Sequence, residues 1–195
     1  MVAYVRVIFA LAVLVCCAHV QAESDALRRL ADCSFGPQLR AHSVTRQPEA
    51  ATSRTVHTSA GALRVSVAGG YRVMLGFADG ASFVHLKLDR SAPGMLGRDR
   101  AAILMQMSEF AAKPGATVAP FKVTLRRGIE VLALDNLTLQ PTVVGVYTLI
   151  SEQHGIIATA YLLNQHGQRA FTTYAQYQAL RESFVDALGG CMAAL

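Results

Sequence analysis

Hydrophobic and polar residues alternate along three stretches between Thr55 and Arg90. In the first stretch Leu63, Val65 and Val67 are apolar and the residues between them are not, and residues 71–77 and 83–88 repeat the pattern. Side chains on a β-strand point alternately to its two faces, so a period of two predicts three half-buried strands.

The turns between these strands can be chosen by register, because cross-strand neighbours share a face of the sheet. A two-residue turn at Asp79–Gly80 keeps the apolar residues of both flanking strands on one side. A three-residue loop, Ala68–Gly70, does the same for the preceding pair, and its glycines accept a left-handed backbone. The predicted cross-strand pairs are Leu75 with Val84, Val73 with Leu86, and Val65 with Val73.

Four further strands are predicted after residue 120. Phe121–Asp135 predicts a second hairpin that turns at Arg127–Gly128 and places Val123 opposite Leu132. In Val143–Ile150 and Ile156–Asn164 apolar residues occupy both faces, which indicates strands that are covered on both sides. These two strands should therefore lie at the centre of the sheet.

Helical periodicity marks three segments. The first is Glu23–Cys33; the second is Asp99–Lys113, whose apolar face holds Ile103, Met107, Phe110 and Ala111. The third begins near Tyr174 with Thr173 and Gln176 as a capping box. Its apolar stripe consists of Tyr177, Leu180, Phe184, Leu188 and Cys191. Residues 34–54 carry no period and predict an irregular surface connection.

This element order predicts an α+β fold, an antiparallel sheet with packed helices in an α/β sandwich whose N- and C-terminal helices are adjacent. It resembles the PsbP-like superfamily, chiefly through Val143–Asn164, then Phe171–Thr173 and the final helix. The resemblance implies a non-enzymatic binding or accessory role, and it transfers no site residue.

Composition excludes several classes of protein. The chain has 195 residues, 52% of them hydrophobic, which excludes a disordered or collagen-like chain. Its net charge of +5 is dispersed, so nucleic acid is not an expected partner. The length after residue 22 suits a single domain, residues 23–195.

Residues 1–22 predict a secretory signal peptide. Arg6 precedes the apolar run Val7–Cys17, and Val20–Ala22 offers small residues for cleavage after Ala22. The run is too short to span a membrane, so no transmembrane segment is expected after cleavage, and the mature chain should be periplasmic or secreted. In the alternative, the chain is a lipid-anchored envelope protein acylated at Cys17, although Cys16 stands where such signals carry a small residue.

Two cysteines, Cys33 and Cys191, lie outside the predicted signal peptide. In an oxidising compartment they should form a disulfide, and the alternative is two separately buried thiols. Closing so long a loop would stabilise the fold by roughly 5 kcal/mol before strain and residual structure are subtracted.

The polar face of the predicted meander offers one candidate binding surface. Register places Arg72 opposite Lys87 and Met74 opposite His85, with Arg64 beside Met74. Because like charges across a sheet repel each other, the patch Arg64, Arg72, His85 and Lys87 would suit an envelope protein or an anionic headgroup. The alternative is a solvated face on which Asp89 relieves the repulsion.

The sequence predicts no catalytic, cofactor or metal site. The histidines have no metal-ligand spacing, and no nucleophile or phosphate-binding motif occurs. We therefore expect an exported accessory or binding protein rather than an enzyme. The alternative is a small periplasmic hydrolase, which requires a carboxylate or histidine near a nucleophile in the deepest pocket.

Overall fold

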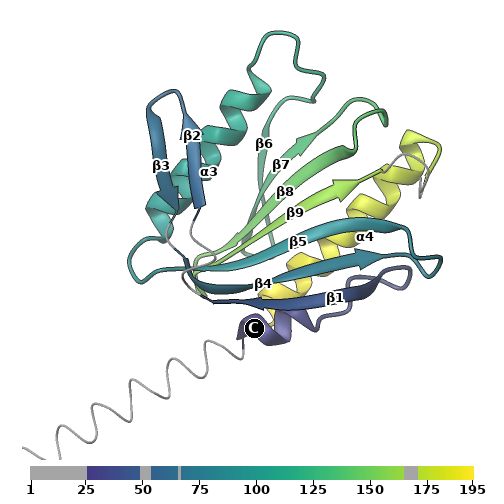
Figure 1. Ribbon diagram of the computed structural model, residues 1–195, viewed down its shortest axis with the longest axis horizontal. Helices are drawn as coiled ribbons and strands as arrows, with labels where there is room; N and C mark the ends of the chain where they lie inside the picture. Colours follow the sequence, from purple (N-terminus) through teal and green to yellow (C-terminus); the bar gives the residue numbers. More distant parts are fainter. Residues whose placement is uncertain (1–25, 49–53, 66, 165–170) are drawn as a thin grey trace, which may run out of the picture.

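The computed structural model describes residues 26–48, 54–65, 67–164 and 171–195 (Figure 1). The predicted signal peptide, the start of the first helix at Glu23 and His166 lie outside the described residues. Residues 26–31 are helical. The remaining elements are β1 (Arg40–Gln47), β2 (Arg54–Thr58), β3 (Gly61–Val65), β4 (Val67–Gly76), β5 (Ser82–Ser91), α3 (Leu96–Ala111), β6 (Lys122–Arg126), β7 (Ile129–Asp135), β8 (Val143–Ser151), β9 (Ile156–Leu163) and α4 (Tyr174–Ala193).

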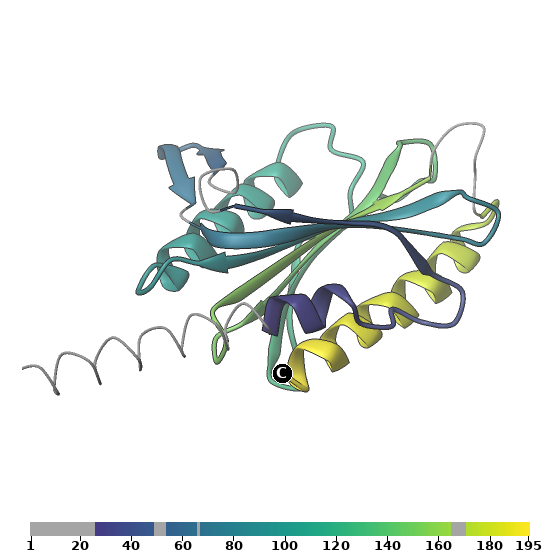
Figure 2. The ribbon, with the colours of Figure 1, turned by 60° about the horizontal axis from the view of Figure 1, so that its bottom comes forward.

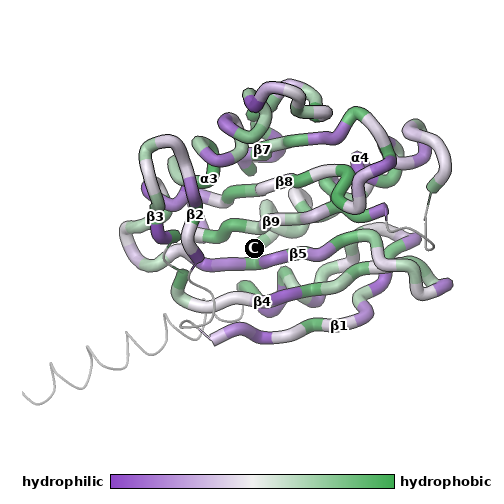
Figure 3. Tube along the Cα trace, turned by 45° about the horizontal axis from the view of Figure 1, so that its top comes forward, coloured by the Kyte–Doolittle hydropathy of each residue, from purple (hydrophilic) through white to green (hydrophobic). Residues whose placement is uncertain are grey.

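Seven of these strands form one antiparallel sheet in the order β1-β4-β5-β9-β8-β7-β6, and β2 pairs with β3 in a separate two-stranded sheet. The predicted α+β class is confirmed. The prediction that two strands covered on both sides lie at the centre is also confirmed, because β9 and β8 occupy the middle of the order. Figure 3 shows the apolar stretches of β8 and β9 and the hydrophilic ones of β1.

The two faces of the central strands meet different helices. Leu149 and Ala158 belong to a core that contains the buried side of α4, whereas their neighbours Ile150 and Ile157 pack in a cluster with Ile103 of α3. Successive side chains on a strand point to opposite faces, so α4 and α3 lie on opposite sides of the sheet (Figure 2).

The register predicted between β4 and β5 is confirmed: Val73 pairs with Leu86, and Leu75 with Val84. The turn is slightly longer than predicted, because a bulge after Leu75 shifts the pairing and the Phe77 amide donates to the Ala81 carbonyl at 2.9 Å. The hairpin at Arg127–Gly128 is also confirmed, with Val123 opposite Leu132.

Two predictions near the N-terminus are wrong. Residues 34–54 are not an irregular connection, since they contain β1, which pairs with β4 and places Val44 opposite Val73. β4 itself begins at Val67, so Ala68–Gly70 is no hairpin loop, and Val65 pairs with Arg54 of β2. The edge strand β1 is exposed along almost its whole length, so neither of its faces needs apolar residues. For this reason the sequence shows no alternation of polar and apolar residues there.

The helices follow the predicted patterns with small shifts. α4 begins with the predicted capping box, in which the backbone N–H of Gln176 donates to the Thr173 hydroxyl. α3 begins at Leu96, before the predicted Asp99, and Phe110 is wrongly assigned to its apolar face because this ring is half exposed.

The predicted disulfide is present. It joins Cys33 to Cys191, with Cα atoms 6.5 Å apart. Close by, the rings of Phe35 and Phe184 lie 6.0 Å apart. The segment after residue 31 is therefore held to the last turns of α4 by a covalent bond and by packing.

Candidate functional site

The predicted basic patch assembles only in part. Arg72 pairs with Lys87, and Met74 with His85, as register required. Arg64 is not beside them: it lies on β3, opposite Thr55 of β2, in the other sheet. The predicted position of Arg64 was wrong because β1, and not the strand that carries Arg64, pairs with β4 on the side away from β5.

The two cations that remain on this face, Arg72 and Lys87, each have a partner within the chain. Arg72 Nη1 lies 2.6 Å from Oδ1 of the buried Asp89, and the Lys87 ammonium lies 4.8 Å from the centre of the Tyr161 ring. Burial, followed by the charge of Lys87, lowers the pKa of His85, so this imidazole is neutral at neutral pH. The ion pair between Arg72 and Asp89 thus relieves part of the repulsion that motivated an anionic ligand.

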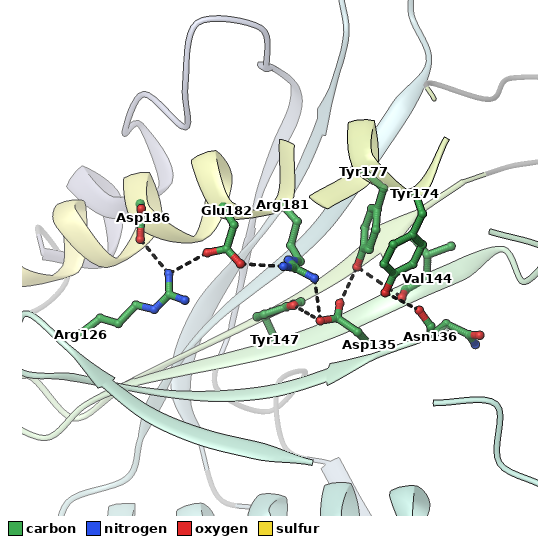
Figure 4. Close-up of polar contacts among 10 residues, drawn as sticks. All are labelled: Arg126, Asp135, Asn136, Val144, Tyr147, Tyr174, Tyr177, Arg181, Glu182 and Asp186. Carbon is green, nitrogen blue, oxygen red and sulfur yellow. Dashed lines mark hydrogen bonds and ion pairs between the residues drawn. The ribbon is translucent and has the colours of Figure 1, made fainter. Parts of the chain in front are cut away.

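A larger polar cluster lies on the opposite face, where α4 crosses β7 and β8 (Figure 4). The carboxylate of Asp135, the last residue of β7, accepts three hydrogen bonds. The Tyr177 hydroxyl donates to Oδ1 at 2.7 Å, and the Tyr147 hydroxyl and Arg181 Nη1 donate to Oδ2 at 2.5 and 2.9 Å. We call these four residues the Asp135 hub.

An outer chain of charges extends the hub along α4. Arg181 Nη2 donates to Glu182 at 2.7 Å, and Arg126 at the end of β6 donates to Glu182 at 3.0 Å and to Asp186 at 2.9 Å. Burial alone would raise the pKa of Glu182, but the hydrogen bonds from both arginines outweigh burial and lower it. These ion pairs connect α4 to the edge of the sheet.

The hub is built into the interior. Burial, the first cause, and the neighbouring Asp135 carboxylate raise the pKa of both Tyr147 and Tyr177, so both phenols stay protonated and remain donors. Gly145 is required beside them, because a Cβ on this residue would collide with the Tyr177 hydroxyl. The Asp135 carboxylate therefore accepts hydrogen bonds from groups that stay protonated, and these bonds hold α4 against β7 and β8.

The helical pattern of the last segment did not reveal this hub. It placed Tyr177 on the apolar stripe and gave no role to Arg181, although residues four positions apart share one face of a helix. A tyrosine and an arginine one turn apart on a buried helix face would have indicated a polar partner on the sheet. Their spacing does not identify Asp135 as that partner.

A groove of about 390 Å³ opens between the segment that follows Cys33 and α4. We call it the terminal groove. Its lining residues are Phe35, Gly36, Pro37, Gln38, Leu39, Phe77, Phe171, Gln176, Ala179, Leu180 and Ser183.

The floor of the terminal groove is aromatic and rests on the core. Phe171 lies 5.8 Å from Phe83 and 5.4 Å from Tyr177, measured between ring centres, and Phe83 also contacts Phe77. Gly36 has φ = 110°, which favours glycine, and brings the chain close to Ser183 across the groove. The packed rings give the groove a preformed floor.

A second hollow, of about 360 Å³, lies beside β6 on the face that carries α3. Arg100 and Glu130 form an ion pair through two hydrogen bonds there, at 2.6 and 2.5 Å. Val123 and Leu125 border the hollow from β6.

Within the described residues no three histidine, cysteine or acidic side chains gather as a metal site. In the same part of the chain, no helix combines the length and the apolar character needed to cross a bilayer.

Comparison with known proteins returned no matching family model, no curated relative and no similar solved structure.

Proposed function

We propose that this chain is an exported binding or accessory module without catalytic activity, and that the terminal groove holds an uncharged, largely apolar group of its ligand. The observation that carries the proposal is the lining of the groove, in which none of the eleven residues is ionisable. A volume of about 390 Å³ is in the range of small-molecule sites.

The same lining favours a module over the alternative hydrolase. Ser183 is the one hydroxyl among the lining residues, and a serine nucleophile needs a base within hydrogen-bond reach. The acidic side chains nearest to it along α4, Glu182 and Asp186, are bonded to Arg126. The amide group of Gln38 and the side-chain NH₂ group of Gln176 instead offer neutral groups around an aromatic floor, while Gln176 Oε1 accepts from the backbone amides of Thr172 and Thr173.

Export to the periplasm or secretion is part of the proposal, and the disulfide between Cys33 and Cys191 supports it. Residues 1–22 would act as the signal peptide, with acylation at Cys17 as the alternative. An intact mass that corresponds to residues 23–195 of the exported protein is the expected result. A diacylglyceryl group on Cys17 would show the lipid-anchored form.

We also propose that the fold is an α/β sandwich of the PsbP-like kind, a single domain over residues 23–195 with adjacent terminal helices. Support comes from the helices on both faces of the sheet and from the contacts that tie residues 33–35 to α4.

Binding of a neutral apolar probe tests the groove. The solvatochromic dye Nile red should bind the wild-type protein, and Ala179→Trp should weaken binding by at least about tenfold because the indole fills the space between α4 and the Phe35 segment. The matched control is Ala175→Trp, an exposed alanine one turn earlier on α4 that does not line the groove.

Equal loss of dye binding in both tryptophan variants would contradict the assignment of the groove, as would no loss in either. A hydrolytic activity that Ser183→Ala abolishes would contradict the non-enzymatic role. Mass spectrometry of the purified protein for copurifying small molecules then identifies the natural ligand class.

A further inference from the structure

One edge of the seven-stranded sheet exposes apolar side chains. β6 is the last strand in the order, and its Val123 and Leu125 are 47% and 74% exposed. Both residues face the side of the sheet that carries α3, beside the second hollow. Exposed apolar residues on an edge strand favour pairing with another strand.

The backbone of β6 is also ready to pair. Arg127 and Gly128 have φ of 52° and 77°, as in a two-residue type I′ turn closed by Arg126 and Ile129. In an antiparallel pair, only every second residue of a strand forms backbone hydrogen bonds with a given neighbouring strand. On β6 these residues are Arg126, Thr124 and Lys122, which bond to β7. The amides and carbonyls of Val123 and Leu125 therefore point outward, and no strand of the described residues pairs with them.

The opposite edge of the sheet is different. β1 presents Arg40 and Arg46 in exposed positions, and cations of this kind protect an edge strand from pairing. On β6, Arg126 is bonded to Glu182 and Asp186, and Lys122 is the exposed cation. β6 therefore presents one exposed cation, Lys122, where β1 presents two exposed arginines.

We propose that β6 pairs in antiparallel orientation with β6 of a second copy of this chain, about a twofold axis at Thr124. In this register Val123 of one copy lies opposite Leu125 of the other, and these two pairs exchange four backbone hydrogen bonds. Shifting the register by two residues would leave an outward amide and an exposed apolar side chain without a partner.

The sequence of β6 is self-complementary about this axis. Lys-Val-Thr-Leu-Arg has the same order of basic, apolar, polar, apolar and basic residues in both directions. Twofold pairing requires one surface to match itself, and this pattern places apolar residues on apolar residues. A second copy of the chain is therefore the occupant that the edge fits.

Charge supports the same register. Lys122 of one copy lies opposite Arg126 of the other, which by itself would be repulsive. However, Arg126 is paired within its own chain with Asp186 at 2.9 Å and Glu182 at 3.0 Å, which offsets its charge. This pairing reduces the repulsion that Lys122 of the second copy meets.

Sedimentation velocity of the exported chain over a concentration series tests the pairing. The wild-type protein should form a dimer, and Val123→Lys should raise its dissociation constant at least about tenfold, because two lysines enter the apolar strip. Val44→Lys is the matched control, since Val44 is 38% exposed on the opposite edge strand. The control should dimerise like the wild type.

Engineered cysteines test the register, even if Val123→Lys fails to fold. In a background where Cys16 and Cys17 are serine, Thr124→Cys should form an intermolecular disulfide under air oxidation. Residues opposite each other in a non-hydrogen-bonded pair have Cα atoms about 4.5 Å apart, within disulfide range. Lys122→Cys is the control, because its copies would be separated by about 13 Å along the strands.

A monomeric wild-type protein at about 100 µM, a concentration at which even weak dimers assemble, would overturn the proposal. It would also be overturned by a dimer that Val123→Lys and Val44→Lys weaken equally, or by equal cross-linking of the two cysteine variants. Dye binding in the terminal groove does not depend on β6, so failure of the dimer and failure of the proposed function are separate results.

Discussion

Replacing Asp135 with asparagine should reveal whether the Asp135 hub is a structural latch or a reactive group. The carboxylate accepts hydrogen bonds from Tyr147, Tyr177 and Arg181, and its side chain is only 15% exposed. An amide has one acceptor oxygen, and its NH₂ group would face donors. The substitution also removes one of the two carboxylates that pair with the Arg181 guanidinium, which is 13% exposed, and leaves Glu182 as the other.

The expected cost follows from this geometry. Removing one partner of a buried ion pair costs about 3–5 kcal/mol, and the lower value applies here because some solvent reaches both groups and Glu182 stays paired with Arg181. We therefore expect Asp135→Asn to lower the free energy of unfolding by about 3 kcal/mol, which corresponds to a decrease of roughly 6–12 °C in melting temperature for a chain of this size. Asp186→Asn removes a carboxylate that also pairs with an arginine but is 59% exposed, and it should cost at most about 0.5 kcal/mol.

Urea unfolding followed by circular dichroism and tyrosine fluorescence measures both variants, since the chain has no tryptophan. The double variant Asp135→Asn with Arg181→Met should cost less than the sum of the single changes, because the second substitution removes the buried guanidinium that the first deprives of one of its two carboxylates. The latch interpretation is refuted if Asp135→Asn is as stable as Asp186→Asn or more stable than the wild type. That result would mean that the carboxylate is kept at a cost to stability, as reactive groups are.

Three further predictions concern neighbouring features. The pKa values of Tyr147 and Tyr177 are raised in the folded protein, so the stability that the two protonated phenols contribute is complete below the ordinary tyrosine pKa of 10 and decreases as the pH rises above it. Both phenols should therefore ionise only as the protein unfolds in alkali, which tyrosinate absorbance and circular dichroism can follow together. Ionisation before unfolding would contradict this prediction. Gly145→Ala should destabilise the protein by about 2 kcal/mol in urea unfolding, because its methyl group displaces the Tyr177 hydroxyl; a neutral effect would mean that the helix shifts freely. Replacing Cys33 and Cys191 with serine should cost about 2–4 kcal/mol in thermal unfolding and weaken dye binding in the terminal groove; unchanged binding would show that packing alone holds the segment after Cys33.

Local patterns determined much of this fold. Apolar residues on both faces of Val143–Ile150 and Ile156–Asn164 placed two strands at the centre of the sheet, where both faces are covered. The register between β4 and β5 followed from alternation, since a slip of one residue would turn every apolar side chain to the wrong face. Two cysteines outside the apolar N-terminal run were enough to predict their pairing.

Tertiary structure alone decided where the edges and the polar sites lie. β1 joins the sheet through backbone hydrogen bonds while its side chains stay in solvent, so no hydrophobic pattern marked it, and its insertion beside β4 sent Arg64 to the other sheet. The Asp135 hub joins residues that are 12, 42 and 46 positions apart, on two strands and a helix. Periodicity reports which side of an element is buried. It does not report which polar groups meet across elements, because that depends on the angle and height at which the helix crosses the sheet.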